Sequence, residues 1–345
     1  MAYTTVNKAT DYFNTKLYTG NGGTNAITGV GFQPDIIWCK ARSYNDDHTI
    51  TDAVRGNTKV VYPNNTNAEA TSSSRVTAFG TDGFTLGTSG DVNSNSDTYA
   101  SWNWKAGGGQ GSSNTDGSIN TTYTSVNTTA GFSISSFTGT GANATVGHGL
   151  GVAPKVIITK SLANAENWGF YHESLGNTKQ LVLNSNAAQT GASAAYYNNY
   201  SPTSSVFYVG TADSTNDAAN MIAYCFAEKT GYSKFGSYSG NGNNDGTFVY
   251  TGFKPAFVIV KATATTDNWT MYDDKRIGYN PKNYFLYPNL NNAEDTSNPQ
   301  WFDMYSNGFK IRSTSSTTNT SGNKYIYMAF GQSLIGSNNV PCTAR

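Results

Sequence analysis

Pro34-Asp-Ile-Ile-Trp-Cys-Lys40 is the stretch that decides the fold, because its pattern recurs twice along the chain. The sequence reads Pro-Lys-Val-Ile-Ile-Thr-Lys at 154–160 and Pro-Ala-Phe-Val-Ile-Val-Lys at 255–261. Each copy has a proline, an apolar run and a lysine six positions after the proline. Consecutive apolar, β-branched residues predict strands that are buried on both faces. A motif that recurs with constant internal spacing indicates an internal repeat.

The residues around this motif repeat in the same order. A glycine-rich turn precedes each copy, and an aromatic strand closes it. Short aromatic and β-branched runs, broken by Gly, Asn, Asp or Ser, are typical of sandwich and barrel folds. These features predict an all-β protein of three tandem, diverged β-sandwich domains of about 100 residues each. The turns begin at Tyr18, Phe137 and Tyr238, and the closing strands cover 99–106, 221–228 and 325–332.

Domain boundaries follow from the unequal distances between the copies. The stretch 107–128 is rich in Gly, Ser, Thr and Asn, which is typical of a linker, and an extra strand around 119–126 fits its apolar residues. No comparable stretch separates the second and third copies. The expected units are a first domain at 1–106, a linker at 107–128, a second domain at 129–229, and a third domain with a C-terminal tail at 230–345.

Composition supports the all-β class and excludes several functional classes. Charged residues make up 13% of the chain, whereas 23 Tyr, 17 Phe and 6 Trp supply apolar bulk. Lys+Arg and Asp+Glu both number 22, so the chain lacks the basic field that attracts nucleic acid. No apolar run approaches the roughly 20 residues of a membrane span. We expect no nucleic-acid partner, no membrane insertion, and helical turns only around 67–73 and 291–296.

The three cysteines indicate folding in a reducing compartment. Cys39, Cys225 and Cys342 lie at positions that do not correspond between copies, whereas a disulfide framework would recur with the repeat. Residues 1–13 contain neither the basic nor the apolar region of a secretory signal. We therefore expect three free thiols and synthesis in a cytoplasm.

Residue patterns for catalysis or metal binding are weak. His48, His148 and His172 are the histidines of the chain, and none lies in a nucleophile turn or at metal-ligand spacing. The glycine-rich stretches lack the Lys-Ser/Thr of a phosphate loop. Carboxylates cluster near Asp46 and Asp267, as a glycosidase would require, but the second copy lacks them. We expect a non-enzymatic protein that holds no cofactor and no metal.

One constellation has the residue types of a binding site. Asp52-x-x-Arg55 and Asp273-x-x-Arg276 occupy equivalent positions in the first and third copies. One interpretation is an ion pair that fixes the loop leaving a buried strand. The other is a sugar site, in which the charged groups bind hydroxyls while the C–H face of the sugar stacks on a tryptophan. The candidate ligand-binding residues are Asp52, Arg55, Trp168, His172, Trp269, Asp273 and Arg276.

Several motifs also resemble a known family. They are Gly31-Phe-x-Pro-x5-Lys40, Asn45-Asp-Asp-His-Thr-Ile-Thr-Asp-Ala-Val-Arg-Gly56, the stretch 226–261, and the ending Gly-Ser-Asn-Asn-Val-Pro-Cys-Thr-Ala-Arg at 336–345. They resemble a repeat domain of uncharacterised function in virion structural proteins of tailed bacteriophages that infect marine bacteria, cyanobacteria included. The resemblance spans nearly the whole chain. It implies a structural, fibre-like part of a virion, without catalytic residues to carry over.

The expected function is that of a phage virion surface protein, a fibre or adhesin component that is assembled in the host cytoplasm and contacts the host envelope. A neutral surface gives little colloidal repulsion, and repeated copies commonly adopt closed symmetry, which favours an oligomer. The resemblance to fibre-like virion proteins implies a homotrimer. The alternative is a monomer whose three copies satisfy one another's contacts. Other virion proteins and a host surface glycan are the expected partners. The alternative functions are a capsid decoration or cementing protein and, third, an enzyme that acts on polysaccharide.

Overall fold

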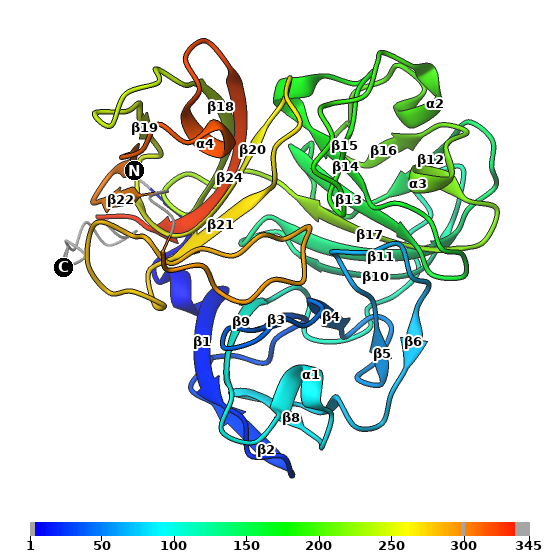
Figure 1. Cartoon of the computed structure of the whole chain (residues 1–345). Coiled ribbons are helices and arrows are strands. Elements are labelled where there is room, and N and C mark those ends of the chain that lie inside the picture. Colours follow the sequence, from blue (N-terminus) through cyan, green and yellow to red (C-terminus); the bar gives the residue numbers. More distant parts are fainter. Residues whose placement is uncertain (1–3, 298–300, 335–345) are drawn as a thin grey trace.

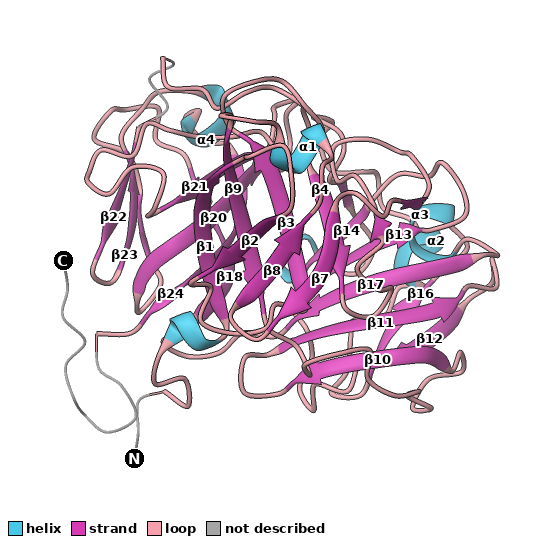
Figure 2. Cartoon of the chain, turned by 90° about the horizontal axis from the view of Figure 1, so that it is seen from below, coloured by secondary structure: helices cyan, strands magenta, loops and turns pink. Residues whose placement is uncertain are grey.

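Strands dominate the computed structural model, which describes residues 4–297 and 301–334. Strands hold 40% and helices 7% of the residues, and the sheets are antiparallel, which confirms the predicted all-β class. Figure 2 shows the helices as single turns between much longer strands. Within the described ranges, no helix has the length and apolar character that crossing a membrane requires.

Each of the three copies, called repeats from here on, forms a four-stranded arrangement with the same strand order. The strands are β1 (Phe13–Thr19), β9 (Thr98–Trp104), β3 (Ile36–Ala41) and β4 (Thr49–Asp52); β11 (Phe132–Thr138), β17 (Asn220–Phe226), β13 (Val156–Ser161) and β14 (Gly169–His172); and β18 (Ser233–Ser239), β24 (Lys324–Gln332), β20 (Lys254–Ala262) and β21 (Thr270–Asp273). The closing strand always pairs with the strand of the proline motif. Lys40, Lys160 and Lys261 therefore share one register position, opposite Ala100, Ile222 and Ile326.

A smaller sheet covers the outer face of each larger one. These sheets contain β2 (Asn25–Thr28), β7 (Val76–Gly80) and β8 (Gly83–Leu86); β12 (Ala144–Gly147) and β16 (Val206–Val209); and β19 (Phe248–Tyr250), β22 (Phe302–Tyr305) and β23 (Gly308–Ile311). In the first repeat, Ile37 and Tyr99 of the larger sheet belong to one buried cluster with Phe84 of the smaller sheet. Corresponding clusters lie in the other two repeats. Each repeat is therefore a small β-sandwich with its own core.

The inner faces of the three larger sheets meet in one further core. Because side chains alternate across a strand, Ile36 and Trp38 face this centre while Ile37 and Cys39 face the outer sheet. Figure 1 shows the three lobes, blue to cyan, green, and yellow to red, around one centre. Both faces of the motif strand are buried, as its apolar run predicts, and the other repeats supply the cover on one of them.

Three aromatic rings mark the middle of this central core. Trp104, Phe226 and Phe330 are equivalent residues near the ends of the closing strands, opposite Ile36, Val156 and Phe257. Their ring centroids lie 5.6–6.3 Å from one another, within the range of favourable aromatic contacts. One hydrophobic cluster thus contains residues of all three repeats, in addition to the three sandwich cores.

The stretch 107–128 adds strand β10 (Thr121–Asn127), which pairs along the edge of β11. The short strands β5 (Lys59–Val60) and β6 (Ala70–Thr71) pair with each other, and β15 (Leu181–Val182) extends the larger sheet of the second repeat beyond β14. The helical turns expected around 67–73 and 291–296 are wrong, because 67–73 contains β6 and 291–296 contains no helix. The turns observed are η1 (Ala9–Asp11), α1 (Gly90–Asn93), η2 (Glu173–Leu175), α2 (Ala194–Tyr197), α3 (Asp213–Asn216) and α4 (Ser316–Asn319).

Candidate functional site

The candidate ligand-binding residues lie at the seams, by which we mean the contacts between neighbouring repeats. Asp52, His172 and Asp273 end the strands β4, β14 and β21 and pair with Ile36, Val156 and Phe257, so the three residues are equivalent. All three are at most 1% exposed. A buried charged or polar side chain requires partners within the protein, and these partners define what the constellation does.

Each Asp–Arg pair is joined by a side-chain ion pair and a backbone hydrogen bond. Nε of Arg55 donates to Oδ2 of Asp52 at 2.6 Å, and the backbone N–H of Arg55 donates to Oδ1. Arg276 and Asp273 repeat this arrangement, with the Nε–Oδ2 distance at 2.5 Å. Burial raises the pKa of Asp273, but the Arg276 guanidinium and its hydrogen bonds outweigh burial and hold that pKa below its usual value. The geometry is that of the ion-pair interpretation, a pair that fixes the turn after a buried strand.

A hydrogen bond from each of these positions reaches the next repeat. His172 donates through Nε2 to a carbonyl, because its Nδ1 accepts from the backbone N–H of Ser174. Trp102 of the first repeat and Tyr224 of the second occupy equivalent positions, and Met328 occupies this position in the third repeat. Because methionine has no hydrogen-bond donor, His172 bonds to a backbone carbonyl of the third repeat instead. The three bonds are Tyr224 Oη to Asp52 Oδ2 (2.7 Å), His172 Nε2 to the Tyr327 carbonyl (3.2 Å), and Trp102 Nε1 to Asp273 Oδ2 (3.1 Å).

A second set of bonds runs in the opposite direction around the ring. Trp168 and Trp269 are 0% and 1% exposed, and each indole N–H donates to a backbone carbonyl of the preceding repeat. His48 takes the equivalent position in the first repeat. The bonds are Trp168 to Tyr62 (2.9 Å), Trp269 to Val182 (3.1 Å), and His48 Nε2 to Tyr287 (3.1 Å). Both tryptophan rings are therefore interior seam residues with no face open to a sugar.

A third set joins the loops. The backbone N–H groups of Glu69, Gln189 and Glu294 donate to the carbonyls of Leu162, Thr263 and Arg42, at 2.8–2.9 Å. Each acceptor lies two residues beyond the lysine of its repeat's motif. Since every set connects first to second, second to third and third to first, the three repeats form a closed ring.

The motif lysines are buried and bind backbone carbonyls after the motif strand, a role that the sequence did not predict. Lys40, Lys160 and Lys261 are 0% exposed, and each ammonium group donates to the carbonyl of the following residue and to the carbonyl four residues on. For Lys160 these distances are 2.7 Å to Ser161 and 3.1 Å to Asn164. Burial lowers the pKa of all three lysines to about 8.

Buried asparagines were missed as well. Asn93, Asn216 and Asn319 are fully buried and end the turns α1, α3 and α4. Nδ2 of Asn319 donates to Asn241 Oδ1 and to the carbonyls of Asn243 and Ser313, so it ties down the glycine-rich turn that opens the repeat. The available signal was an asparagine a few residues before each closing strand.

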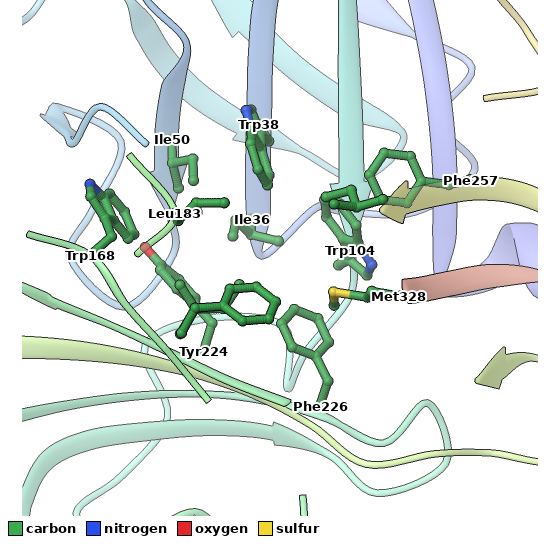
Figure 3. A pocket seen from close by; sticks show the side chains of 13 residues that line it. Ile36, Trp38, Ile50, Trp104, Trp168, Leu183, Tyr224, Phe226, Phe257 and Met328 are labelled. Atoms are coloured by element: carbon green, nitrogen blue, oxygen red, sulfur yellow. The ribbon is translucent and has the colours of Figure 1, made fainter. Parts of the chain in front are cut away.

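The cavity at the centre of the ring is apolar. Figure 3 shows side chains from all three lobes converging on it, among them Ile36, Trp104, Tyr224 and Met328. Its volume is about 20 Å³, and apolar cavities of this kind stay dry. It is a packing void of the central core and too small for a ligand.

One protein-family model matches the chain, at residues 8–333, and its description is Domain of unknown function (DUF7483). The chain belongs to this family. The match begins before β1 and ends after β24, so a single DUF7483 unit comprises all three repeats and their shared core. No curated protein and no solved structure matches the chain.

Thiols and metal ligands of this DUF7483 chain do not assemble into a site in the described part. Cys39 and Cys225 are free and buried, as predicted, whereas Cys342 lies outside the described residues. Burial raises the pKa of the Cys39 thiol to about 12, which leaves it protonated and unreactive. Residues 4–297 and 301–334 contain no group of three His, Cys, Asp or Glu residues that could hold a metal ion.

Exposed aromatic residues distinguish the third repeat of this DUF7483 chain. Phe248 and Tyr250 of β19 are 44% and 57% exposed. By the pairing register they correspond to Ala26 and Thr28 in the first repeat. The third repeat carries five of the seven large apolar side chains that are exposed in the described residues: Phe248, Tyr250, Tyr279, Trp301 and Tyr305. Exposed aromatic side chains are thus concentrated on the third repeat.

Proposed function

We propose that the protein is a non-catalytic structural component of a bacteriophage virion surface, and that it serves as a fibre or adhesin component contacting the host envelope. The observation that carries this proposal is the closed ring. The candidate polar residues Asp52, His172 and Asp273 are all engaged in bonds between repeats. Because these polar groups hydrogen-bond to neighbouring repeats, they support a mechanical role for the protein. The resemblance to virion structural proteins supports a role on a particle.

Attachment is favoured over a purely mechanical role by the exposed rings of the third repeat. Aromatic side chains that project into water are typical of binding surfaces, because they contribute large contact areas at a low entropic cost. Phe248 and Tyr305 lie 6.1 Å apart and form one small platform. This platform is confined to one lobe, as a contact face for an external partner would be.

A capsid decoration or cementing role is the second candidate, and the ring itself favours it. The three repeats supply to one another, within one chain, the contacts that a homotrimer would otherwise supply. Light scattering on the purified chain separates the two candidates. A mass near 36.9 kDa favours a decoration unit added singly, whereas about three times that mass favours a trimeric fibre.

The decisive experiment locates the protein on particles. Antiserum raised against the purified chain is applied to virions of the phage that encodes it, and the label is imaged by electron microscopy. In parallel, purified chain is added to host cells before infection. Tail labelling with reduced adsorption supports attachment, and uniform head labelling without reduced adsorption supports decoration. Intact and disrupted virions that both lack the protein would overturn the proposal.

A further inference from the structure

A groove runs along the seam between the first and third repeats, and we propose that it is a binding site for an anionic saccharide. It consists of three adjoining hollows with volumes of about 490, 210 and 450 Å³. Lys275 lines all three, and Lys254 and Asp274 line the last two, so the hollows form one continuous surface. The floor on the first-repeat side is strand β1.

The groove lies along one edge of β1. Among the described residues, β1 pairs with β9 on one side and with no strand on the other. In the second repeat the equivalent strand, β11, pairs on that side with β10 from Phe132 to Phe137. The extra strand from 107–128 therefore fills in the second repeat the position that the groove occupies beside β1.

Cations gather in this groove although the chain as a whole is neutral. Its walls contain five lysines and a single carboxylate. Lys8 has Asp11 at 3.0 Å, and Lys275 has Asp274 at 3.9 Å. The Asp82 carboxylate, which accepts from the backbone N–H groups of Gly29 and Gly31, lies near Lys16. Lys282 is 3% exposed, and its ammonium group donates to the Ile277 carbonyl. Five lysines against these three carboxylates leave an excess of positive charge, which complements an anionic ligand. The lysines are Lys8, Lys16, Lys254, Lys275 and Lys282, and the carboxylate is Asp274.

An exposed aromatic ring favours a saccharide among anions. Tyr279 lines the third hollow and is 71% exposed, so its ring is open to the C–H face of a sugar.

Other anionic polymers fit less well. Nucleic acid requires a basic field over a larger surface than five lysines on a neutral chain supply. An acidic peptide could extend the sheet at β1 through backbone hydrogen bonds. It would, however, leave the exposed ring of Tyr279 without a role. The binding test below therefore includes an acidic peptide as a competing ligand.

The test uses the purified full chain and isothermal titration with oligogalacturonate, in which every sugar ring carries a carboxylate. The control ligand is its methyl ester, which has the same rings without the charge. We expect binding of the acid and at least about tenfold weaker binding of the ester at low salt, since charge pairing at this exposed site is screened by ions. No binding of the acid, or equal binding of the ester, overturns the proposal.

Variants locate the site. The double variant Lys8→Glu/Lys275→Glu should weaken binding at least about tenfold, and Tyr279→Ala should weaken it about threefold or more. Lys179→Glu, which carries the same charge change in the second repeat, should leave it within about twofold. Equal losses in all three variants overturn the assignment of the site. So does polyglutamate that binds as tightly as the oligosaccharide, because this result indicates a peptide at β1.

The inference supplies a ligand class for the proposed attachment role, but it rests on the groove alone. Binding by the purified chain does not depend on where the protein sits in a particle. Failure of virion labelling and failure of saccharide binding are therefore separate results.

Discussion

The hydroxyl of Tyr224 donates a hydrogen bond to Oδ2 of Asp52 at 2.7 Å, across the seam between the second and first repeats. The same carboxylate oxygen accepts from Nε of Arg55. A buried ion pair of one repeat is thus completed by a tyrosine of another. This bond belongs to the ring of contacts that makes three sandwiches one structure.

Replacing Tyr224 by Phe should lower the free energy of unfolding by about 1.5–3 kcal/mol, because a hydrogen bond to a buried charged group is lost. Urea unfolding of the full chain measures this change. Tyr200→Phe is the matched control, since Tyr200 is 55% exposed and should change stability by less than about 0.5 kcal/mol. Equal stability of the two variants would show that the seam bond contributes nothing.

Asp273→Asn should destabilise the protein by up to about 3–5 kcal/mol, because the buried Arg276 loses its nearest carboxylate and keeps only that of Glu294, at 3.2 Å. Asp245→Asn removes an exposed partner of Lys310, and Asp245 is 76% exposed in its side chain, so its effect should stay below about 1 kcal/mol. The denaturant concentrations at which Asp273→Asn and Asp245→Asn are half unfolded provide the comparison. A small effect at Asp273 would contradict the assigned role of the pair.

Each buried lysine should contribute stability that rises with pH above about 8. Burial lowers the pKa of Lys160 to about 8 from the usual 10.5, so between these values its side chain binds more protons in the unfolded chain than in the folded one. The contribution of each such lysine to the free energy of unfolding should increase by up to about 1.4 kcal/mol per pH unit, whereas Cys39 and Cys225, whose pKa burial raises, contribute a slope of the opposite sign above about 8.5.

Lys160→Met should make this dependence shallower, and Lys179→Met should leave it unchanged. Denaturation curves between pH 7.5 and about 9.5 avoid ionisation of the tyrosines, whose usual pKa is about 10. A slope that is the same in the wild type and in Lys160→Met would refute the assignment.

A repeat expressed alone should not fold, although the sequence predicts three sandwich domains. The fragment 4–106 keeps its own sandwich core but exposes Ile36, Trp38 and Trp104 of the central core. The full chain should unfold in one cooperative transition. Far- and near-ultraviolet circular dichroism of the fragment and of the chain provides the measurement. A fragment with a native-like near-ultraviolet spectrum would establish independent domains.

Local sequence patterns were sufficient to predict the positions of the strands, but not to predict whether the candidate site residues are exposed or buried. The run Ile36-Ile37-Trp38 indicates burial on both faces, and the structure has it, because alternation along a strand is a local property. Trp168 and Trp269 lie in the runs Trp-Gly-Phe-Tyr and Trp-Thr-Met-Tyr, whose alternating apolar residues fit a core position as well as an exposed platform. The difference depends on residues more than 80 positions away in the chain.

The sequence by itself determined the all-β class, the threefold recurrence of the proline motif, and the equivalence of Asp52 with Asp273. These depend on spacing, composition and residue order within each repeat. Only the tertiary structure decided that the repeats close into a ring, that Tyr224 and Trp102 complete the ion pairs, and that lysines of the first and third repeats line one groove beside β1. Such relationships join side chains of different repeats, and they exist only once the sheets have packed around a common core. The free energy that selects this packing comes from apolar faces meeting at the centre, a property of no single repeat.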